Sequence, residues 1–366
     1  MTYLDNPFTP SFGEMPVHLA GRRQIVSSIL QAFQSERRRP ELTALLSGAR
    51  GTGKTTLLSL LAAKAEPLGW ISVETTARPG MLDDIEIGVR RRASHLLKKQ
   101  KTANVAGVDI AAIGGLSFHA PSQEPSNWRS RMEDILDQLE QLDCGLLITV
   151  DEIDPSLPDM IELAIVYQHF VREGRRVALI MAGLPHNVSA LISDKTVSFL
   201  RRAQLFKLGR IADIDVNTAL VRTISEYGRE ADPAGLSSAV KEISGFPFLM
   251  QLIGYRAWDI SPTSNSISAS DFQQGIQAAR EEMESRILEA TYRELSSEDI
   301  RFLNAMLVDE EDSSIADITK RLNRSSSQVA QYRRRLIDAG VIGERKRGVV
   351  GFDLPYFRDY LINMTC

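Results

Sequence analysis

The sequence of 366 residues has little cysteine and no long hydrophobic run. Its two cysteines, Cys144 and Cys366, lack the spacing of metal-ligand pairs, which argues against a disulfide framework and favours a reducing compartment. No apolar run approaches the roughly 20 residues that span a bilayer, so we expect no membrane partner. Residues 1–16 lack a basic segment followed by an apolar one, so we expect no signal peptide and a cytoplasmic location.

The sequence also lacks a strong charge of one sign. Its formal net charge of −4 provides no overall attraction for a polyanion, so any nucleic-acid contact must come from a local cluster of basic residues. Hydrophobic residues make up 43% and charged residues 25%, which is typical of a globular protein with a sizeable core. The length leaves room for two or three domains.

The most specific motif is a glycine-rich stretch, Gly48-Ala49-Arg50-Gly51-Thr52-Gly53-Lys54-Thr55. A short apolar run precedes it and a helical pattern follows it, so the stretch is predicted to join a strand to a helix. Such a loop directs backbone N–H groups at a polyphosphate. We therefore predict that these residues and Thr56 bind ATP or ADP, with Lys54 at the β- and γ-phosphates and Thr55 on Mg²⁺. The flanks disfavour the alternative of a glycine-rich turn without a ligand.

A second motif is the apolar run Leu146-Leu147-Ile148-Thr149-Val150, which ends in Asp151 and Glu152. It predicts a buried parallel strand with polar groups at its carboxyl end. A lone strand that ends in two acids is a weak signal, but after a phosphate loop it supplies the expected acidic partner. We expect Asp151 to hold the Mg²⁺ shell and Glu152 to act as general base toward the attacking water.

Strands alternate with helices as far as residue 210, and the pattern is helical from there on. This order predicts an α/β fold, a P-loop NTPase with a parallel sheet, a helical lid and a C-terminal winged helix-turn-helix. A basic helix over 83–101 fits a solvated face better than a nucleic-acid site, and a hairpin over 108–118 has no assigned function. The expected domains are an N-terminal strap laid over the next domain (1–20), the ATPase core (21–210), the lid (211–295) and the winged helix (296–366).

The C-terminal segment combines three helical patterns with a glycine-bounded hairpin, which is typical of a winged helix. Its basic residues are concentrated on the third helix and the hairpin: Arg324, Arg333, Arg334, Arg335, Arg345, Lys346 and Arg347. We expect double-stranded DNA as the partner. Gln328, Gln331, Arg333 and Arg334 would face the groove, and 345–347 would clamp the backbone. The alternative is a module that docks protein or acts against its own ATPase domain.

Together these motifs resemble AAA+ ATPases of the archaeal replication-initiator type and bacterial ATP-binding proteins with a C-terminal winged helix, which share features with STAND signalling ATPases. The resemblance covers nearly the whole chain. The residues that carry it are Ala20-Gly21-Arg22, the phosphate loop, Val150-Asp151-Glu152-Ile153-Asp154 and Gly245-Phe246-Pro247-Phe248-Leu249-Met250-Gln251. It implies that Gly21 and Arg22 belong to the adenine pocket, although a helix that merely covers the sheet is an alternative, and that Pro247 lies near the nucleotide.

The sequence departs from these families at several positions. Met181-Ala182-Gly183 stands where many AAA+ proteins have a polar sensor, and the role of Asn187 is open. The lid motif lacks an arginine and is closer to the Gly-x-Pro of STAND proteins. Either Arg201 or Arg202 would be an arginine finger from a neighbouring subunit of a homo-oligomer, unless both are surface arginines.

These departures favour slow hydrolysis, since the loss of a finger lowers turnover strongly. The expected function is an ATPase switch whose nucleotide state controls DNA binding by the winged helix. The alternative is a signalling or defence ATPase whose winged helix docks protein.

Overall fold

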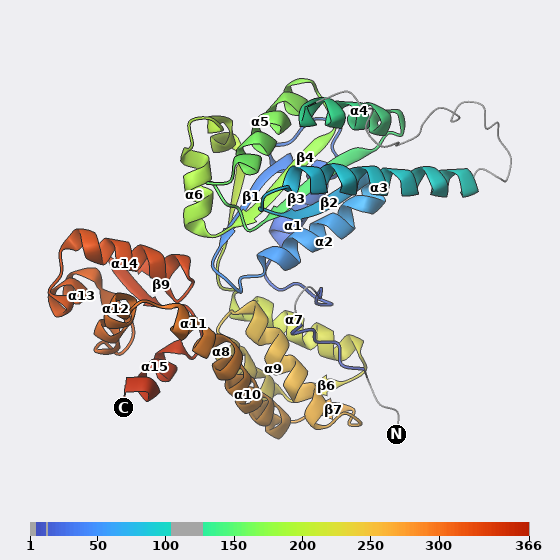
Figure 1. The fold of residues 1–366 in the computed structure, drawn as a ribbon. Helices are drawn as coiled ribbons and strands as arrows, with labels where there is room; N and C mark the ends of the chain where they lie inside the picture. Colours follow the sequence, from blue (N-terminus) through green and yellow to red (C-terminus); the bar gives the residue numbers. More distant parts are fainter. Residues whose placement is uncertain (1–4, 12–13, 104–126, 366) are drawn as a thin grey trace. The chain divides into compact units, whose positions relative to one another are not determined.

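The computed structural model describes residues 5–11, 14–103 and 127–365, so the hairpin predicted at 108–118 lies outside the described residues. The chain divides into two compact units (Figure 1). One, here called the sheet unit, comprises Gln24–Gly48 and Lys54–Leu208. The other, the helical unit, comprises Met1–Arg23, Ala49–Gly53 and Gly209–Cys366. The tip of the phosphate loop therefore groups with the C-terminal part of the chain.

The sheet unit contains a five-stranded parallel sheet in the order β2-β3-β4-β1-β5. Its strands are β1 (Thr43–Gly48), β2 (Trp70–Thr76), β3 (Gly145–Asp151), β4 (Val177–Gly183) and β5 (Gln204–Leu208). All seven residues of β4 and all but the last of β3 are buried, as expected of strands covered on both faces. The predicted parallel P-loop sheet is confirmed.

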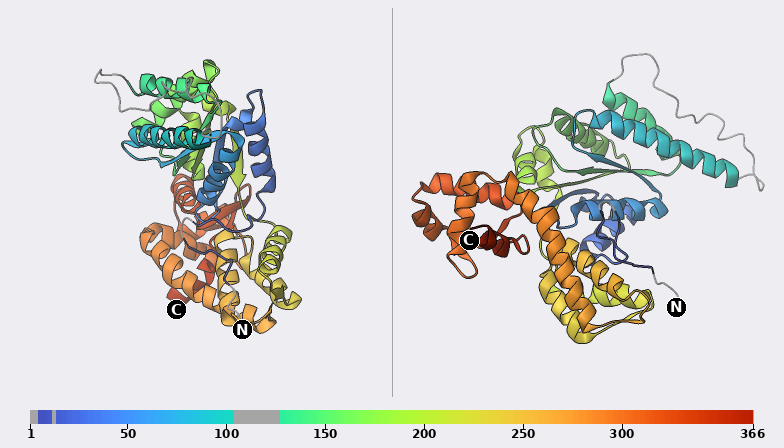
Figure 2. Two further views of the ribbon diagram at one scale, coloured as in Figure 1. Left: turned by 90° about the vertical axis from the view of Figure 1, so that its right-hand side faces the viewer. Right: turned by 60° about the horizontal axis from the view of Figure 1, so that its bottom comes forward.

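One helix precedes the strands of this sheet and the others connect them (Figure 1). They are α1 (Arg23–Gln34), α2 (Lys54–Ala65), α3 (Met81–Ala103), α4 (Trp128–Gln141), α5 (Pro158–Arg172) and α6 (Pro185–Ser193), with short 3₁₀ turns at Pro40–Leu42, Glu66–Leu68 and Ser198–Arg202. Helices α3 and α4 pack together, as both views in Figure 2 show. In the predicted basic helix, Arg90 pairs with buried Glu86 at 3.1 Å, whereas Arg91 and Arg92 are exposed.

The helical unit is built around one continuous hydrophobic cluster. Its helices are α7 (Asp213–Glu226), α8 (Pro233–Ile243), α9 (Pro247–Ile260), α10 (Ala269–Met283), a π-helical turn (Glu284–Leu288), α11 (Glu289–Glu294), α12 (Ser297–Leu307), α13 (Ile315–Leu322), α14 (Ser326–Asp338) and α15 (Phe357–Thr365). The cluster includes Leu249 of α9, Phe272 of α10, Phe302 of α12 and Phe357 of α15, all fully buried. The lid and the C-terminal segment thus share one core.

The C-terminal segment contains a small antiparallel sheet. Strands β9 (Ile342–Lys346) and β10 (Val349–Phe352) form a hairpin, and β8 (Ser313–Ser314) pairs with the other edge of β10. A second two-stranded pairing joins β6 (Glu230–Ala231) to β7 (Ser266–Ile267) within the lid. The third helix and the hairpin lie where the sequence predicts them, and α15 follows as an additional helix.

The N-terminal strap lies on the lid helix α9, so the prediction that it covers the next domain along the chain is wrong. Phe8 is buried against Gly254, where an added Cβ would come within 2.5 Å of the Phe8 ring. Asn6 donates hydrogen bonds to the Tyr255 carbonyl at 3.0 Å and to Asp259 at 2.8 Å. The missing side chain at Gly254 provides the space that the strap fills.

Candidate nucleotide-binding site

The two ends of the phosphate loop are held by the sheet unit. Gly48 closes β1 and Lys54 begins α2. The Lys54 amine donates a hydrogen bond to the Gly48 carbonyl at 2.9 Å, so its positive charge stays within the loop. The Thr55 hydroxyl donates to Asp151 Oδ2 at 2.5 Å. The two residues predicted as magnesium ligands, which come from α2 and β3, therefore lie in direct contact.

The backbone after β3 takes an unusual conformation. Asp151 is the last residue of the strand, and its Oδ1 accepts a hydrogen bond from the Glu152 N–H at 2.9 Å. Glu152 has a φ of +56°, which costs a non-glycine residue on the order of 1–3 kcal/mol. Buried Ile153 follows and donates its N–H to the Ala182 carbonyl of β4 at 2.9 Å. This anchor leaves the Glu152 side chain exposed at the carboxyl edge of the sheet.

The tip of the loop depends on its glycines. Gly51 and Gly53 have φ values of +77° and +82°, which favour glycine. A Cβ at Gly51 would lie 2.5 Å from the ring of Phe246, so the ring covers this face of the loop. Thr52 is buried, and its hydroxyl donates to the Ala49 carbonyl at 2.8 Å. Pro247 begins α9 directly after Phe246, which brings the predicted lid motif to the loop tip.

A buried arginine adjoins the same tip. Arg22 is only 8% exposed and donates to the carbonyls of Gly209 at 2.6 Å and Thr52 at 3.4 Å. Burial lowers the pKa of its guanidinium. Within the described part of the chain, no carboxylate forms an ion pair with it. Gly21, with a φ of +65°, packs closely on Ile211. Arg22 therefore ties the loop tip to the segment that follows β5.

The predicted sensor and arginine-finger positions differ in how deeply they are buried. Met181 and Ala182 are buried, and Asn187 is half-buried in α6. Arg201 and Arg202 are both exposed on the 3₁₀ turn before β5. The Arg201 Nε donates to the Ile192 carbonyl at 3.3 Å, which orients its side chain, whereas Arg202 shows no such bond among the described residues.

The predicted DNA contacts on α14 are only partly available. Gln328 belongs to the cap of the helix, because its side-chain oxygen accepts bonds from the N–H of Ser325 at 3.2 Å and its hydroxyl at 3.0 Å. Gln331 is exposed and Arg333 is half-buried. Arg334 lies 3.9 Å from Asp338, a weak surface contact. Of the two glutamines, Gln331 is therefore the one whose side chain is not engaged in the helix cap.

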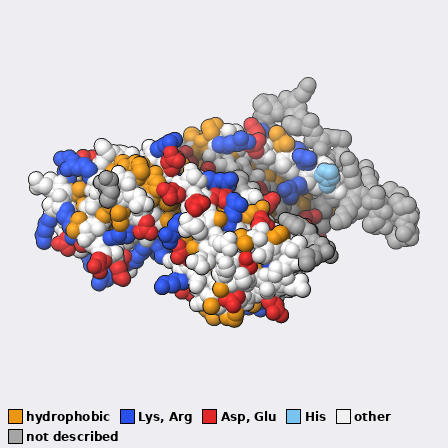
Figure 3. Space-filling view, turned by 90° about the horizontal axis from the view of Figure 1, so that it is seen from below, with side chains coloured by type: hydrophobic (Ala, Val, Ile, Leu, Met, Phe, Trp, Pro, Cys, Tyr) orange, Lys and Arg blue, Asp and Glu red, His pale blue; other side chains and the backbone are white. Residues whose placement is uncertain are grey.

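Acidic residues pair with several of the basic residues in the folded chain. Arg345 lies 2.7 Å from Asp353 and 3.4 Å from Asp312. Arg335 lies 2.7 Å from Asp299, which belongs to the capping box of α12. The part of the molecule at the left of Figure 3, where Figure 1 places the C-terminal segment, accordingly shows basic and acidic side chains intermixed. Lys346 and Arg347 are exposed, and neither has an ion pair among the residues described.

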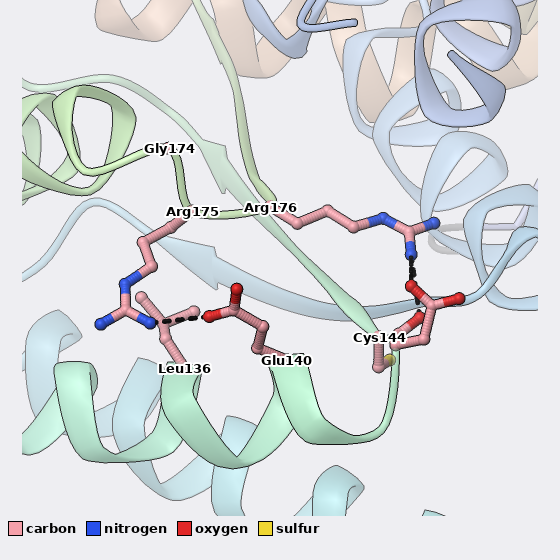
Figure 4. Close-up of a pocket in the computed structure, with 7 residues that line it drawn as sticks. Leu136, Glu140, Cys144, Gly174, Arg175 and Arg176 are labelled. Atoms are coloured by element: carbon pink, nitrogen blue, oxygen red, sulfur yellow. Dashed lines mark hydrogen bonds and ion pairs between the residues drawn. The ribbon is translucent and has the colours of Figure 1, made fainter. Parts of the chain in front are cut away.

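A cavity of about 180 Å³ lies in the sheet unit beside Cys144 (Figure 4). Its charged side chains are already paired, Arg175 with Glu140 at 2.9 Å and Arg176 with Asp143 at 3.0 Å. Burial raises the pKa of the Cys144 thiol, which keeps it in the unreactive protonated form. The cavity adjoins the start of β3, and parallel α/β sheets bind ligands at the opposite, carboxyl ends of their strands. We assign it no function.

Comparisons with known proteins show which fold this is. The family model described as "Domain of unknown function (DUF8462)" matches residues 285–361, and no curated protein matches the sequence. The structure is similar to the ORC2 protein of Aeropyrum pernix in ADPNP–ADP complexes, with a TM-score of 0.66, 14% identity and coverage of 99% of this chain and 97% of that one. No helix of the described residues is long and apolar enough to cross a membrane.

Two further solved structures are similar along their whole length. A Walker-type ATPase of Pyrococcus abyssi has a TM-score of 0.64 and 16% identity, with 94% of this chain and 99% of that chain covered. The Cdc6p protein of Pyrobaculum aerophilum has a TM-score of 0.51 and 14% identity, with both chains covered completely. The chain therefore has the fold of the archaeal ORC/Cdc6-type P-loop ATPases, as its motifs predict.

Proposed function

We propose that this protein is an ATP-binding, slowly hydrolysing switch. The observation that carries the proposal is the arrangement at the carboxyl edge of the sheet, where Lys54 and Thr55 begin α2 and Thr55 contacts Asp151 at 2.5 Å. The glycine conformations at the loop tip support a polyphosphate ligand. Calorimetric titration of the wild-type and Lys54→Ala proteins with ATP is the direct test.

Mg²⁺ suits this site because the adjoining groups are hard oxygen donors. The Thr55 hydroxyl and the Asp151 carboxylate would hold it, and the ion would neutralise charge on the phosphates. Proteins usually bind magnesium with one or two carboxylates together with water and substrate phosphates.

The roles of the remaining residues follow from their positions. Exposed Glu152, held by its left-handed backbone beside Asp151, would accept a proton from the attacking water. Arg22 and Gly21 would lie at the base side of the nucleotide, and Pro247 would bring the lid to it. The proposed division into core (21–210), lid (211–295) and C-terminal segment (296–366) serves a switch, because bound phosphate groups can bias the lid and whatever the lid carries.

We expect Arg201 or Arg202 to act as an arginine finger in a homo-oligomer. If it does, the hydrolysis rate per molecule should rise with wild-type protein concentration, and one of the two alanine variants should lose most of that rise, by up to about 10³-fold. Steady-state phosphate release over a concentration series measures this effect. Normal rates in both variants at every concentration would mean that the two residues are surface arginines.

The C-terminal segment is proposed to be a winged helix that binds double-stranded DNA. Three helices, the β9–β10 hairpin and the third strand β8 support the fold assignment. Exposed Lys346 and Arg347 at the end of the hairpin, with Gln331 on α14, support the DNA contact. The alternative, a signalling or defence ATPase that docks protein through this segment, is favoured by the ion pairs that neutralise Arg335 and Arg345.

Replacing both Lys346 and Arg347 by alanine should weaken the binding of all duplexes alike. Each lost phosphate contact lowers the slope of log K against log salt by about one unit. Fluorescence anisotropy of the full-length protein on random duplexes, across a salt series with ATP or ADP, measures both effects. Lys241→Ala, an exposed lysine of α8, is the matched control. If the wild-type protein binds no duplex at low salt in either nucleotide, the protein-docking alternative replaces the DNA proposal.

A further inference from the structure

The tip of the phosphate loop is covered by a turn from the far end of the sequence. Gly340 lies between α14 and β9, is buried, and has a φ of +73°. A Cβ placed there would lie 3.1 Å from the Ala49 Cβ and 3.3 Å from the Arg50 backbone nitrogen. The backbone conformation favours glycine at this position, and the close approach of the loop leaves little room for a Cβ.

Two more contacts hold the same tip. The Phe246 ring packs on Gly51, as described above, and Arg50 reaches Glu294 of α11 at 3.5 Å. Both of these charged side chains are about 70% exposed, so the ion pair itself contributes little. The tip is restrained chiefly by close packing of Ala49 against Gly340 and of Gly51 against the Phe246 ring.

The turn that carries Gly340 is firmly joined to the C-terminal segment. Its neighbour Leu336 is fully buried, and Arg335 of α14 pairs at 2.7 Å with Asp299 of α12, which is 5% exposed. Beside the loop tip a cavity of about 480 Å³ is lined by Gly51, Phe246, Asp299, Arg335, Leu336 and Gly340, among others. The turn is thus tied to α14 and α12, so we expect a change in the loop tip either to break the contact or to move these helices.

We propose that the α14–β9 turn is an autoinhibitory clamp on the phosphate loop, so that clamping and nucleotide binding oppose each other. Backbone N–H groups of such a loop bind phosphate oxygens, and here the Gly340 turn lies close to the Arg50 backbone while the Phe246 ring lies against Gly51. The Lys54 amine donates to the Gly48 carbonyl of the same loop. The clamp rests on the proposed binding of ATP. By linkage, if the clamp weakens ATP binding, ATP must weaken the clamp by the same factor.

A reversible disulfide tests the clamp directly. The double variant Ala49→Cys/Gly340→Cys is made in a background in which Cys144 and Cys366 are replaced by serine. The Cβ separation expected from the structure is close to the 3.5–4.5 Å of a disulfide, so a small shift closes the bond. We expect the full-length oxidised protein to bind ATP at least ten-fold more weakly than the same protein after reduction. Saturating ATP should slow disulfide formation in the reduced protein.

A second pair of variants needs no cross-link. Gly340→Ala introduces a Cβ against Ala49 and should loosen the clamp, which raises ATP affinity several-fold. Gly348→Ala is its matched control, because Gly348 has a similar φ of +79° but nothing within 4 Å of its added Cβ. This comparison separates release of the loop from the backbone strain that both substitutions share.

The outcomes distinguish the clamp from the function on which it rests. If the reduced double variant and the wild-type protein both fail to bind ATP, the proposed function is wrong. If they bind it, and oxidation leaves the affinity unchanged or increases it, the clamp is overturned. Failure of the disulfide to form, together with equal ATP affinities of the Gly340→Ala and Gly348→Ala proteins, also overturns it.

Discussion

The Lys54→Ala protein should lose measurable ATP binding while it remains folded. Lys54 supplies the point charge of the loop, and in the structure its amine donates a hydrogen bond to the Gly48 carbonyl. A charge-assisted bond to phosphate contributes about 1.5–3 kcal/mol, and its loss together with the uncompensated phosphate charge should lower affinity by about 100-fold or more. Isothermal titration calorimetry with ATP and Mg²⁺ measures the loss.

Lys64→Ala is the matched control for this substitution. Lys64 is an exposed lysine in the last turn of the same helix, α2, and its removal should leave ATP affinity unchanged. Circular dichroism confirms that both variants retain the wild-type helix content. A folded Lys54→Ala protein with wild-type affinity for ATP would remove the basis for the nucleotide site.

The Glu152→Gln protein should bind ATP normally and hydrolyse it about 10²–10⁴-fold more slowly, the usual contribution of a general base. Glutamine keeps the shape of the side chain and loses its basicity. The backbone that aims it, with a φ of +56° and the Ile153 N–H bonded to β4, involves no Glu152 side-chain atom and is therefore preserved. Single-turnover hydrolysis at saturating ATP isolates the chemical step from binding.

Glu162→Gln, an exposed glutamate of α5, is the control for the loss of one carboxylate in the same unit. Its hydrolysis rate should equal that of the wild-type protein. If Glu152→Gln also hydrolyses ATP at the wild-type rate, another group orients the attacking water, and Glu152 has no catalytic role.

The sequence allowed the sheet and the phosphate-binding edge to be predicted because both depend on local patterns. Apolar runs, glycine spacing and the acids after β3 are each encoded within a few residues. The helices α6 and α15 were missed because they are short, and their positions depend on tertiary packing, as the full burial of Phe357 indicates. The π-helical turn between α10 and α11 likewise has no pattern that separates it from a continuous helix.

Long-range pairings explain the remaining differences. The location of the strap depends on the space at Gly254, which is far from Phe8 in the sequence. The charge of the C-terminal segment was counted from basic residues close together in sequence, whereas Asp299 and Asp353 reach Arg335 and Arg345 only in the folded chain. Gly254 lies inside an otherwise regular helical pattern, which is a local sign that another segment approaches the helix at this position.

The shared hydrophobic cluster of the lid and the C-terminal segment has a consequence for how this chain unfolds. Cutting the chain before Ser296 would expose apolar faces on both fragments, including those of Leu249 and Phe302. The two parts should therefore open as one cooperative unit, whose most protected amides share one free energy of opening in hydrogen exchange. A structural change caused by a nucleotide would then reach the C-terminal helices as a movement of this whole cooperative unit, and no linker within it would unfold.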